Sequence, residues 1–454
     1  MNATFFVSTV HGLEEELCAE IEALAEECNI RLCDTPRAES AGVEVRAPWS
    51  FCYALNLGLR CASRVLVEVA QAEVKTLSDV HSSLIGVDWS EFFSVDKTFI
   101  VNSSSSDKTI SSSALNLKIK DAIADSFSNR TNRRPNIDKN DPLVRVMARL
   151  HRGLLIVSLD TTGIPLSVRG YRVSNQAAPM NELLAAGLLR MTGWHNLCRE
   201  LQSETPKRVT FTRVSEAQTD KKSSDDYDSR QSLQRRIPGE IVLSPDFIDP
   251  MCGSGTLAIE AALMLLNRRP QLQRDNFAFE QLNLFSENTK RKFEPIRRAL
   301  RGHELSLMQL FLRMNKYHTD ALGREIDPHQ VVSPILCFDQ DRRALSAAQE
   351  NAEAAGVSRL IRFEQRSIEK LKVGTQEGLI VMNPPYGVRM GEVESLKHDY
   401  KKIGDTLKQN CRGWQAWILT ENESLARSVG LRATRRKKVF NGGLECLWLQ
   451  YVLF

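Results

Sequence analysis

The amino-acid sequence predicts an α/β protein whose C-terminal half contains a mostly parallel, Rossmann-like sheet. Three apolar runs support this fold class, because each leads into a polar residue where a parallel strand would end. The runs are 241–243 with 247–248, 335–338, and 379–382, and they lead into Asp249, Asp339 and Asn383. Helical spacing of apolar residues follows over 257–266 and 344–355, which is typical of strand–turn–helix units.

The N-terminal part of the chain alternates strand and helix patterns. Residues 4–10 predict a strand, and the apolar residues from Leu13 to Leu24 line one face of a helix with acidic residues in its first turn. A returning strand at 43–45 would complete a small α/β cap over residues 1–49. A second domain over 50–165 is indicated by alternating patterns at 51–59, 64–69, 98–102, 114–127, 144–150 and 154–160.

Residues 166–200 are expected to connect this region to the catalytic domain and to contribute its first helix. The catalytic domain would then occupy residues 201–454. Within it, residues 203–240 are polar and poor in apolar residues, which predicts a disordered insertion. At the end of the chain, 416–419 predicts a buried strand, and the runs 437–440 and 444–453 flank an Asn-Gly turn that predicts a hairpin.

The stretch 249–256 (DPMCGSGT) has the composition of a loop that wraps a nucleotide-like cofactor. Gly253 and Gly255 permit positive φ and close backbone approach, and the start of the following helix offers free N–H groups. The stretch has neither the phosphate-loop nor the dinucleotide-loop pattern. Glycine turns that bind nothing are the alternative. The predicted cofactor contacts here are Asp249, Pro250, Cys252, Gly253, Ser254, Gly255 and Thr256.

A second carboxylate ends the next predicted strand. Asp339, with Gln340 beside it, is placed to accept the hydroxyls of a ribose, as acidic residues do in dinucleotide folds. Asp341 is better suited to capping the helix that begins at Arg342, and a capping role is also the alternative for Asp339.

The stretch 383–386 (NPPY) predicts a clamp for a flat ring that carries an amino group. Two prolines stiffen the backbone and remove two N–H donors, so that the segment presents acceptors. The Asn383 side-chain oxygen and the Pro384 carbonyl would accept the amine hydrogens, and Tyr386 would stack on the base. With Pro385, these four residues are the predicted catalytic set. A proline turn without function is the alternative.

Together these motifs resemble the class I methyltransferases that act on amino groups. The fuller pattern is similar to the bacterial guanine-N2 methyltransferases of large-subunit ribosomal RNA that carry an N-terminal THUMP domain. The resemblance covers nearly the whole chain and rests on residues 8–14, 118–123, 134–138, 169–172, 178–179, 182–186, 249–256, 383–387 and 441–444.

The resemblance implies a ferredoxin-like and THUMP α+β region over the N-terminal part of the chain, with THUMP at 50–165. A Rossmann-like class I methyltransferase domain would follow, with a seven-stranded, mostly parallel sheet ending in an antiparallel hairpin. It implies S-adenosylmethionine as the cofactor and 23S ribosomal RNA, or a large-subunit assembly intermediate, as the partner.

The chain also departs from the family pattern. Ser367 stands where an acidic residue usually meets the adenine amine, so the resemblance implies a cofactor contact there with weaker affinity. Val388 replaces an acidic residue after NPPYG, and residues 303–333 look inserted. Some family members carry a second methyltransferase domain; because this chain stops at Phe454, we expect only the first activity.

RNA contacts are expected at basic residues of two segments. Lys118, Lys120, Arg133 and Arg134 surround an Asn-Arg-Arg-Pro stretch, and Arg169 and Arg172 flank Tyr171 in an arrangement suited to stacking and phosphate contact. Solvated surface charge is the alternative for each.

Composition limits the function classes less sharply. The net charge of +4 is too small to indicate nucleic-acid binding by itself. The ten cysteines include no C-x-x-C pair, and the histidines are not at metal-ligand spacing, so we expect free thiols and no metal. No stretch is apolar enough for a membrane span, and a cytoplasmic protein is expected.

The sequence therefore predicts transfer of a methyl group from S-adenosylmethionine to the N2 of a guanine in 23S rRNA. Three alternatives stay open: guanine-N2 methylation of tRNA, adenine-N6 methylation of DNA, and a non-catalytic RNA-binding or ribosome-assembly protein with a vestigial pocket.

Overall fold

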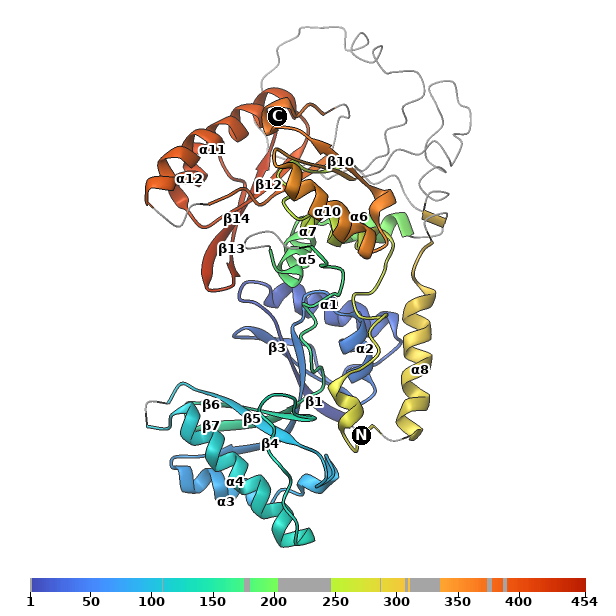
Figure 1. Cartoon of the computed structure of the whole chain (residues 1–454), viewed down its shortest axis with the longest axis vertical. Helices are drawn as coiled ribbons and strands as arrows, with labels where there is room; N and C mark the ends of the chain where they lie inside the picture. The colour runs from blue at the N-terminus through green and yellow to red at the C-terminus, as the bar shows by residue number, and fades with distance from the viewer. Residues whose placement is uncertain are drawn as a thin grey trace.

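The computed structural model describes residues 2–107, 109–174, 180–202, 246–285, 287–306, 309–310, 335–373, 378–386 and 390–454. Several expectations lie outside these residues: the strand at 241–243, the disordered insertion at 203–240, most of the insertion at 303–333, the 178–179 motif, Gly387 and Val388. The described residues form two seven-stranded sheets, one from each half of the chain (Figure 1).

The first sheet consists of β1 (Asn2–Ser8), β2 (Arg37–Glu39), β3 (Gly42–Pro48), β4 (Arg64–Glu73), β5 (Phe99–Ser105), β6 (Val144–His151) and β7 (Leu154–Asp160). Its helices are α1 (Glu14–Glu27), α2 (Phe51–Gly58), α3 (Leu77–Ile85) and α4 (Ser112–Thr131). The predicted strands and helices are all present. The sequence analysis missed β2, which has only three residues, and α3.

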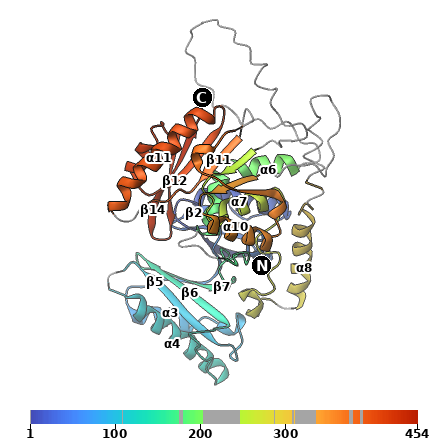
Figure 2. The same ribbon diagram turned by 45° about the horizontal axis from the view of Figure 1, so that its top comes forward.

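One continuous sheet joins the two N-terminal regions that the sequence separates at residue 50. Its strand order is β2-β3-β1-β4-β7-β6-β5, with β1 paired to both β3 and β4, and β4 paired to β7. Helices α3 and α4 cover one face of the part of this sheet that β4, β7, β6 and β5 form (Figure 2). The apolar side of this sheet and its helices share one core.

The second sheet consists of β8 (Asp246–Asp249), β9 (Ile335–Asp339), β10 (Ile361–Gln365), β11 (Gly378–Met382), β12 (Gln415–Thr420), β13 (Arg435–Asn441) and β14 (Leu444–Val452). The order is β10-β9-β8-β11-β12-β14-β13, parallel through β12 and antiparallel in the final hairpin. The predicted fold class, including this hairpin, is confirmed.

Helices cover both faces of the second sheet. They are α5 (Glu182–Met191), α6 (Trp194–Gln202), α7 (Thr256–Leu265), α10 (Arg342–Ala354), α11 (Met390–Asn410) and α12 (Glu423–Ser428). The buried strand β11 alternates between two cores: Leu379 and Val381 face α5–α7 and α10, whereas Ile380 and Met382 face α11 and α12. Among the described helices, none is both long and apolar enough to cross a bilayer.

Helix α8 (Glu287–Gly302) belongs to the catalytic half in sequence but packs on α2 of the first (Figure 1). Tyr53 from α2 meets Phe279, Phe285 and Phe293 with ring centroids 5.2–5.7 Å apart. The described part of residues 277–302 therefore supports the N-terminal core.

The loop after β1 docks on the catalytic half. The Phe440 N–H of β13 donates to the His11 carbonyl oxygen over 3.1 Å, and the Leu13 side chain enters the core around α5. Gly12 has φ +93°, and a Cβ built there would lie 2.2 Å from the Lys438 carbonyl oxygen. Only glycine fits this contact, because the position combines positive φ with close backbone approach.

We expect Gly12→Ala to lower the free energy of unfolding by about 1–3 kcal/mol, because the methyl group meets backbone that cannot give way. Gly86→Ala is the matched control, since Gly86 has nothing within 4 Å of a built Cβ. The control should leave the unfolding temperature unchanged or slightly raised. Equal unfolding temperatures for the two variants in a thermal scan would contradict the tight docking of this loop.

Candidate functional site

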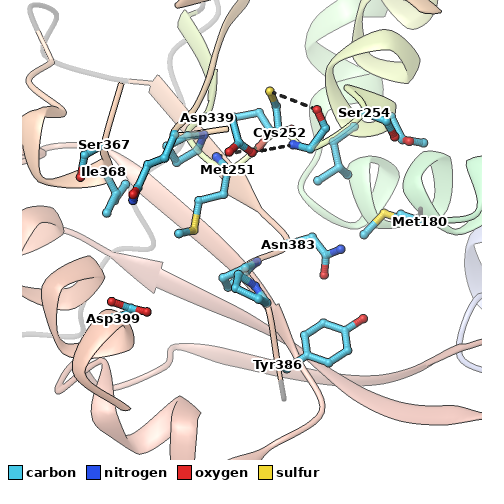
Figure 3. Close-up of a pocket in the computed structure, with 18 of the residues that line it drawn as sticks. Met180, Met251, Cys252, Ser254, Asp339, Ser367, Ile368, Asn383, Tyr386 and Asp399 are labelled. Atoms are coloured by element: carbon cyan, nitrogen blue, oxygen red, sulfur yellow. Dashed lines mark hydrogen bonds between the residues drawn. The ribbon is translucent and has the colours of Figure 1, made fainter. Parts of the chain in front are cut away.

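A cavity of about 820 Å³ lies where the carboxyl ends of β8, β9 and β11 meet. Side chains from the glycine loop, from the ends of β9 and β11, and from α11 surround it (Figure 3). Of the predicted site residues, those lining it are Asp249, Pro250, Cys252, Gly253, Ser254, Thr256, Asp339, Gln340, Ser367, Asn383, Pro384, Pro385 and Tyr386. The volume is in the usual range for cofactor sites.

The glycine loop bends sharply into the N-terminus of α7. Gly253 and Gly255 have φ of +53° and +82°. A Cβ on Gly253 would meet nothing within 4 Å, so a ligand can approach its backbone, whereas one on Gly255 would lie 3.0 Å from the Ala348 Cβ. Gly255 thus does not line the cavity but allows α7 to pack on α10. The N–H groups that begin α7 favour a polar or anionic ligand group.

Cys252 is a buried thiol within this loop. A hydrogen bond with Cys337 lowers its pKa, but burial and the charges of Asp249 and Asp339 outweigh that bond and leave the pKa raised. A protonated, buried thiol is a poor nucleophile, so Cys252 fills space beside the cofactor loop.

The two aspartates that flank Gln340, Asp339 at the end of β9 and Asp341 before α10, have different roles in the fold. Asp341 caps α10 by accepting from the Arg343 N–H over 2.8 Å, as predicted. Asp339 accepts from the Gly253 N–H and the Asp341 N–H, both over 3.0 Å, and its carboxylate lines the cavity. The ribose contact of Asp339 stays a prediction; its place beside the glycine loop is compatible with it.

Asp249 is buried at the end of β8, with 1% of its surface exposed. Burial raises the pKa of its carboxyl group to about 8; the Met251 N–H opposes this rise and the charge of Asp339 adds to it. At neutral pH the group is therefore largely protonated in the free protein. A cationic ligand in the cavity would favour its ionised form.

Asn383 follows β11 and lies between Met251 of the glycine loop and Tyr386 (Figure 3). Its side-chain Oδ1 is buried and accepts no hydrogen bond from the described residues. A buried acceptor without a donor is costly, so a ligand that donates a hydrogen bond to this oxygen would be favoured. Pro384 and Pro385 contribute no N–H that could fill this place.

Tyr386 is half-buried and fixed by the hairpin turn of the second sheet. Its hydroxyl oxygen accepts from Asn441 Nδ2 over 2.8 Å, and burial raises the pKa of the phenol to about 12 despite this bond. Asn441, Gly442 and Leu444 line the cavity as well. The sequence predicts this turn only as a hairpin, and its contribution to the site was not predicted.

The position of Ser367 is accompanied by a carboxylate that the sequence analysis did not identify. Ser367 donates its hydroxyl to Glu369 over 3.2 Å, and Glu369 also pairs with Lys402 over 3.1 Å. Glu369, Lys402 and Asp399 all line the cavity. An acidic group is thus present near Ser367, although it is two residues later in the chain than the family pattern places it.

Arg169, Tyr171 and Arg172 do not lie on an open surface, and the prediction that Arg169 and Tyr171 contact RNA is wrong. The Arg169 side chain is 1% exposed, and it and the Tyr171 hydroxyl approach the buried Glu260 of α7 at 3.6 and 3.1 Å. Buried groups cannot reach phosphates.

Arg172 braces the cofactor loop rather than facing open solvent, because its side chain is 16% exposed. Its guanidinium donates to Ser254 Oγ over 3.3 Å and to Thr256 Oγ1 over 3.2 Å. It also pairs with Glu182 over 3.0 Å. These partners leave little of the guanidinium for a phosphate.

The basic residues predicted to contact RNA on α4 and just after it lie at the surface of the first half. Arg133 and Arg134 are exposed and pair with Asp96 and Asp125, and Lys120 pairs with Asp121. Lys118 is partly buried on α4. Their contact with RNA stays a prediction.

Three family models match successive parts of this chain. They describe an RlmL ferredoxin-like domain over 4–66, a THUMP domain over 74–160 and an RMKL-like methyltransferase domain over 244–450. A protein of Synechocystis sp., slr0064, that is provisionally named an RNA methyltransferase is 30% identical, with 99% of this chain and 97% of that protein covered. The chain belongs to the RMKL-like methyltransferase family.

Other relatives are longer than this methyltransferase. The ribosomal RNA large subunit methyltransferases K/L of Methylococcus capsulatus and Pseudoalteromonas atlantica are 31% and 32% identical over 98% and 99% of the chain. The chain spans only 50% and 53% of their lengths. The ferredoxin-like and THUMP domains of the first half and the methyltransferase domain of the second half are those of the predicted family.

Solved structures share the whole fold. SMU.472, crystallised with S-adenosylhomocysteine, has a TM-score of 0.74 at 22% identity, and a Clostridium difficile methylase has 0.74 at 24%. They cover 100% of this chain, and this chain covers 98% and 99% of theirs. The match to the methyltransferase family implies S-adenosylmethionine as the cofactor. The glycine loop, the α7 N-terminus and the carboxyl groups of Asp249 and Asp339 fit its amino acid and ribose parts.

We expect the affinity for S-adenosylmethionine to rise as pH increases from 6 to above 8. The raised pKa of Asp249 means that its proton must leave before the carboxylate can face the cationic ligand. Calorimetry in buffers of different ionisation enthalpy should detect proton release at pH 7. The ligand's own amino group also titrates near pH 8. Proton release is therefore compared between the wild type and the Asp249→Asn variant, which isolates the contribution of this carboxyl group. Equal proton release in both proteins would contradict the role of Asp249.

Proposed function

We propose that this protein transfers the methyl group of S-adenosylmethionine to the exocyclic N2 of a guanine in 23S rRNA. The observation that carries the proposal is the buried Asn383 Oδ1, which has no donor among the described residues and lies beside the glycine loop and Tyr386. An exocyclic amino group supplies the missing hydrogen bond.

The proposed chemistry depends mainly on positioning. The amine donates to Asn383 Oδ1 and to the Pro384 carbonyl oxygen, which favours a pyramidal nitrogen whose lone pair is less delocalised into the ring. The bound cofactor supplies an electrophilic methyl group. The methyl group would pass to the nitrogen lone pair, and the electrons of its bond to sulfur would stay on sulfur. The methylated amine then loses a proton to solvent, so no strong general base is required.

The target base would have to leave its stack to reach Asn383. Tyr386 offers a ring face to an extruded base, and the Asn441 contact fixes the orientation of that ring. Unstacking costs a few kcal/mol, and less for a base that is already unpaired. Guanine rather than adenine is proposed from the family resemblance, because the acceptors alone suit either amine.

RNA as the substrate is supported by the THUMP match and by the names of the K/L relatives. In the proposed division of the chain, the N-terminal cap (1–49) and the THUMP domain (50–165) hold the RNA. Residues 166–200 link them to the methyltransferase domain (201–454), which carries out the reaction. A large-subunit assembly intermediate is the proposed partner where free rRNA is not methylated.

The test uses rRNA and tRNA from cells that lack this protein, incubated with methyl-labelled S-adenosylmethionine and digested to nucleosides. Labelled N2-methylguanosine in 23S rRNA is the expected result. The same nucleoside in tRNA alone would move the substrate to tRNA, and labelled N6-methyladenosine would overturn the guanine assignment. No labelling despite cofactor binding calls for the same assay on ribosomal precursor particles, and no binding would indicate a vestigial pocket.

Two substitutions should separate catalysis from cofactor binding. Asn383→Ala removes an acceptor for the amine and should lower kcat by a hundredfold or more, while S-adenosylmethionine binds almost as in the wild type. Asp339→Ala should instead weaken cofactor binding, because the carboxylate lines the cavity beside the Gly253 N–H. Calorimetric titration and single-turnover methyl transfer measure both. An Asn383→Ala protein that loses both properties equally would indicate a structural role.

A further inference from the structure

Strand β13 carries four consecutive cations, Arg435, Arg436, Lys437 and Lys438, and all four are exposed. Successive residues of a strand point to opposite faces, so this pattern requires that both faces near them be open. β13 is the edge strand of the second sheet. In Figures 1 and 2 its hairpin extends toward the first sheet, on the side opposite α3 and α4.

Half of this charge has no ion-pair partner among the described residues. Arg435 and Arg436 have no carboxylate partner among the described residues. Lys437 pairs with Glu15 and Lys438 with Glu445, over 2.9 and 2.8 Å, and both pairs are exposed. Exposed pairs contribute little, so these lysines can exchange their partners for phosphates.

Protection of a sheet edge against aggregation is the competing explanation, because edge strands often carry charge. The other charged edges use both signs. On β10, Glu364 pairs with Arg362 and Arg366, and on β2, Arg37 pairs with Glu39. Edge protection therefore does not require four charges of one sign, and the composition of β13 points to an anionic ligand.

The position of β13 identifies that ligand further. The strand ends at Asn441, which holds Tyr386, and the turn after it borders the cavity. At about 3.3 Å per residue, the cations begin about 10 Å from Asn441 and extend to about 20 Å. A polyanion that follows this strand would thus reach the mouth of the cavity.

We propose that residues 435–438 of β13 bind the sugar–phosphate backbone of the RNA beside the target base. The inference rests on the proposed function, since it places these phosphates next to the flipped guanine. The contacts fix the position of the RNA and carry no sequence information, because they meet only the backbone. They would add a concentrated cationic surface to a protein whose net charge is only +4.

The test is the double variant Arg435→Gln/Arg436→Gln, with direct binding to 23S rRNA from cells that lack this protein. The dissociation constant is measured by filter binding at several KCl concentrations. Each lost phosphate contact should reduce the slope of log K against log salt by about 1, so the slope should fall by about 2. The affinity should fall on the order of tenfold at low salt, and cofactor binding should not change.

The matched control is Arg359→Gln/Arg362→Gln, which removes the same charge at the opposite edge of the same sheet. An unchanged slope in the β13 variant, or an equal fall in the control, overturns the inference. Because binding is measured without methyl transfer, its failure is distinguishable from failure of the proposed function. A wild-type protein that binds this RNA with the β13-dependent slope but forms no N2-methylguanosine would refute only the latter. A wild-type protein that binds neither this RNA nor ribosomal precursor particles overturns both.

Discussion

The buried carboxylate of Glu260 on α7 holds the two halves of the chain together. Arg169 and Tyr171, from the segment that follows the first sheet, both meet it. Arg169 also donates to the Arg60 carbonyl oxygen, and the Arg60 guanidinium donates to the carbonyl oxygens of Leu263 and Arg268. Burial raises the pKa of Glu260, and the arginines oppose that rise. Removing one partner of such a group typically costs 3–5 kcal/mol, so the segment, α7 and the glycine loop that begins α7 are positioned as one unit.

Contacts between the two halves also position the wall of the cavity. The β13–β14 hairpin receives the loop at His11 and Gly12 on one side, while its turn fixes Tyr386 through Asn441 on the other. The N-terminal half therefore contributes to the shape of the site without lining it. A substitution in the first fifteen residues can alter the pocket although it touches neither cofactor nor substrate.

Much of the site was predictable because strand ends in parallel sheets converge at one edge. Asp249, Asp339 and Asn383 each follow an apolar run, and the topology alone brings them together. The burial of Arg169 and Tyr171 was not predictable, since it depends on Glu260, 89 residues after Tyr171. Glu369 and Asn441 also come from other segments. The missed helix α3 did carry a local signal: Thr76 and Asp79 form a capping box at its start.

The strand β4 has a consequence for how such proteins can be recombined. It spans Arg64–Glu73, whereas the ferredoxin-like family model ends at residue 66 and the THUMP model begins at 74. The border between two inherited units thus falls within one strand, which pairs with β1 on one side and β7 on the other. A chimera that exchanges either unit at that border would inherit one half of a hydrogen-bonded ladder. An exchange that leaves this ladder intact has to include the whole first sheet, together with α8 and the aromatic residues that complete its core.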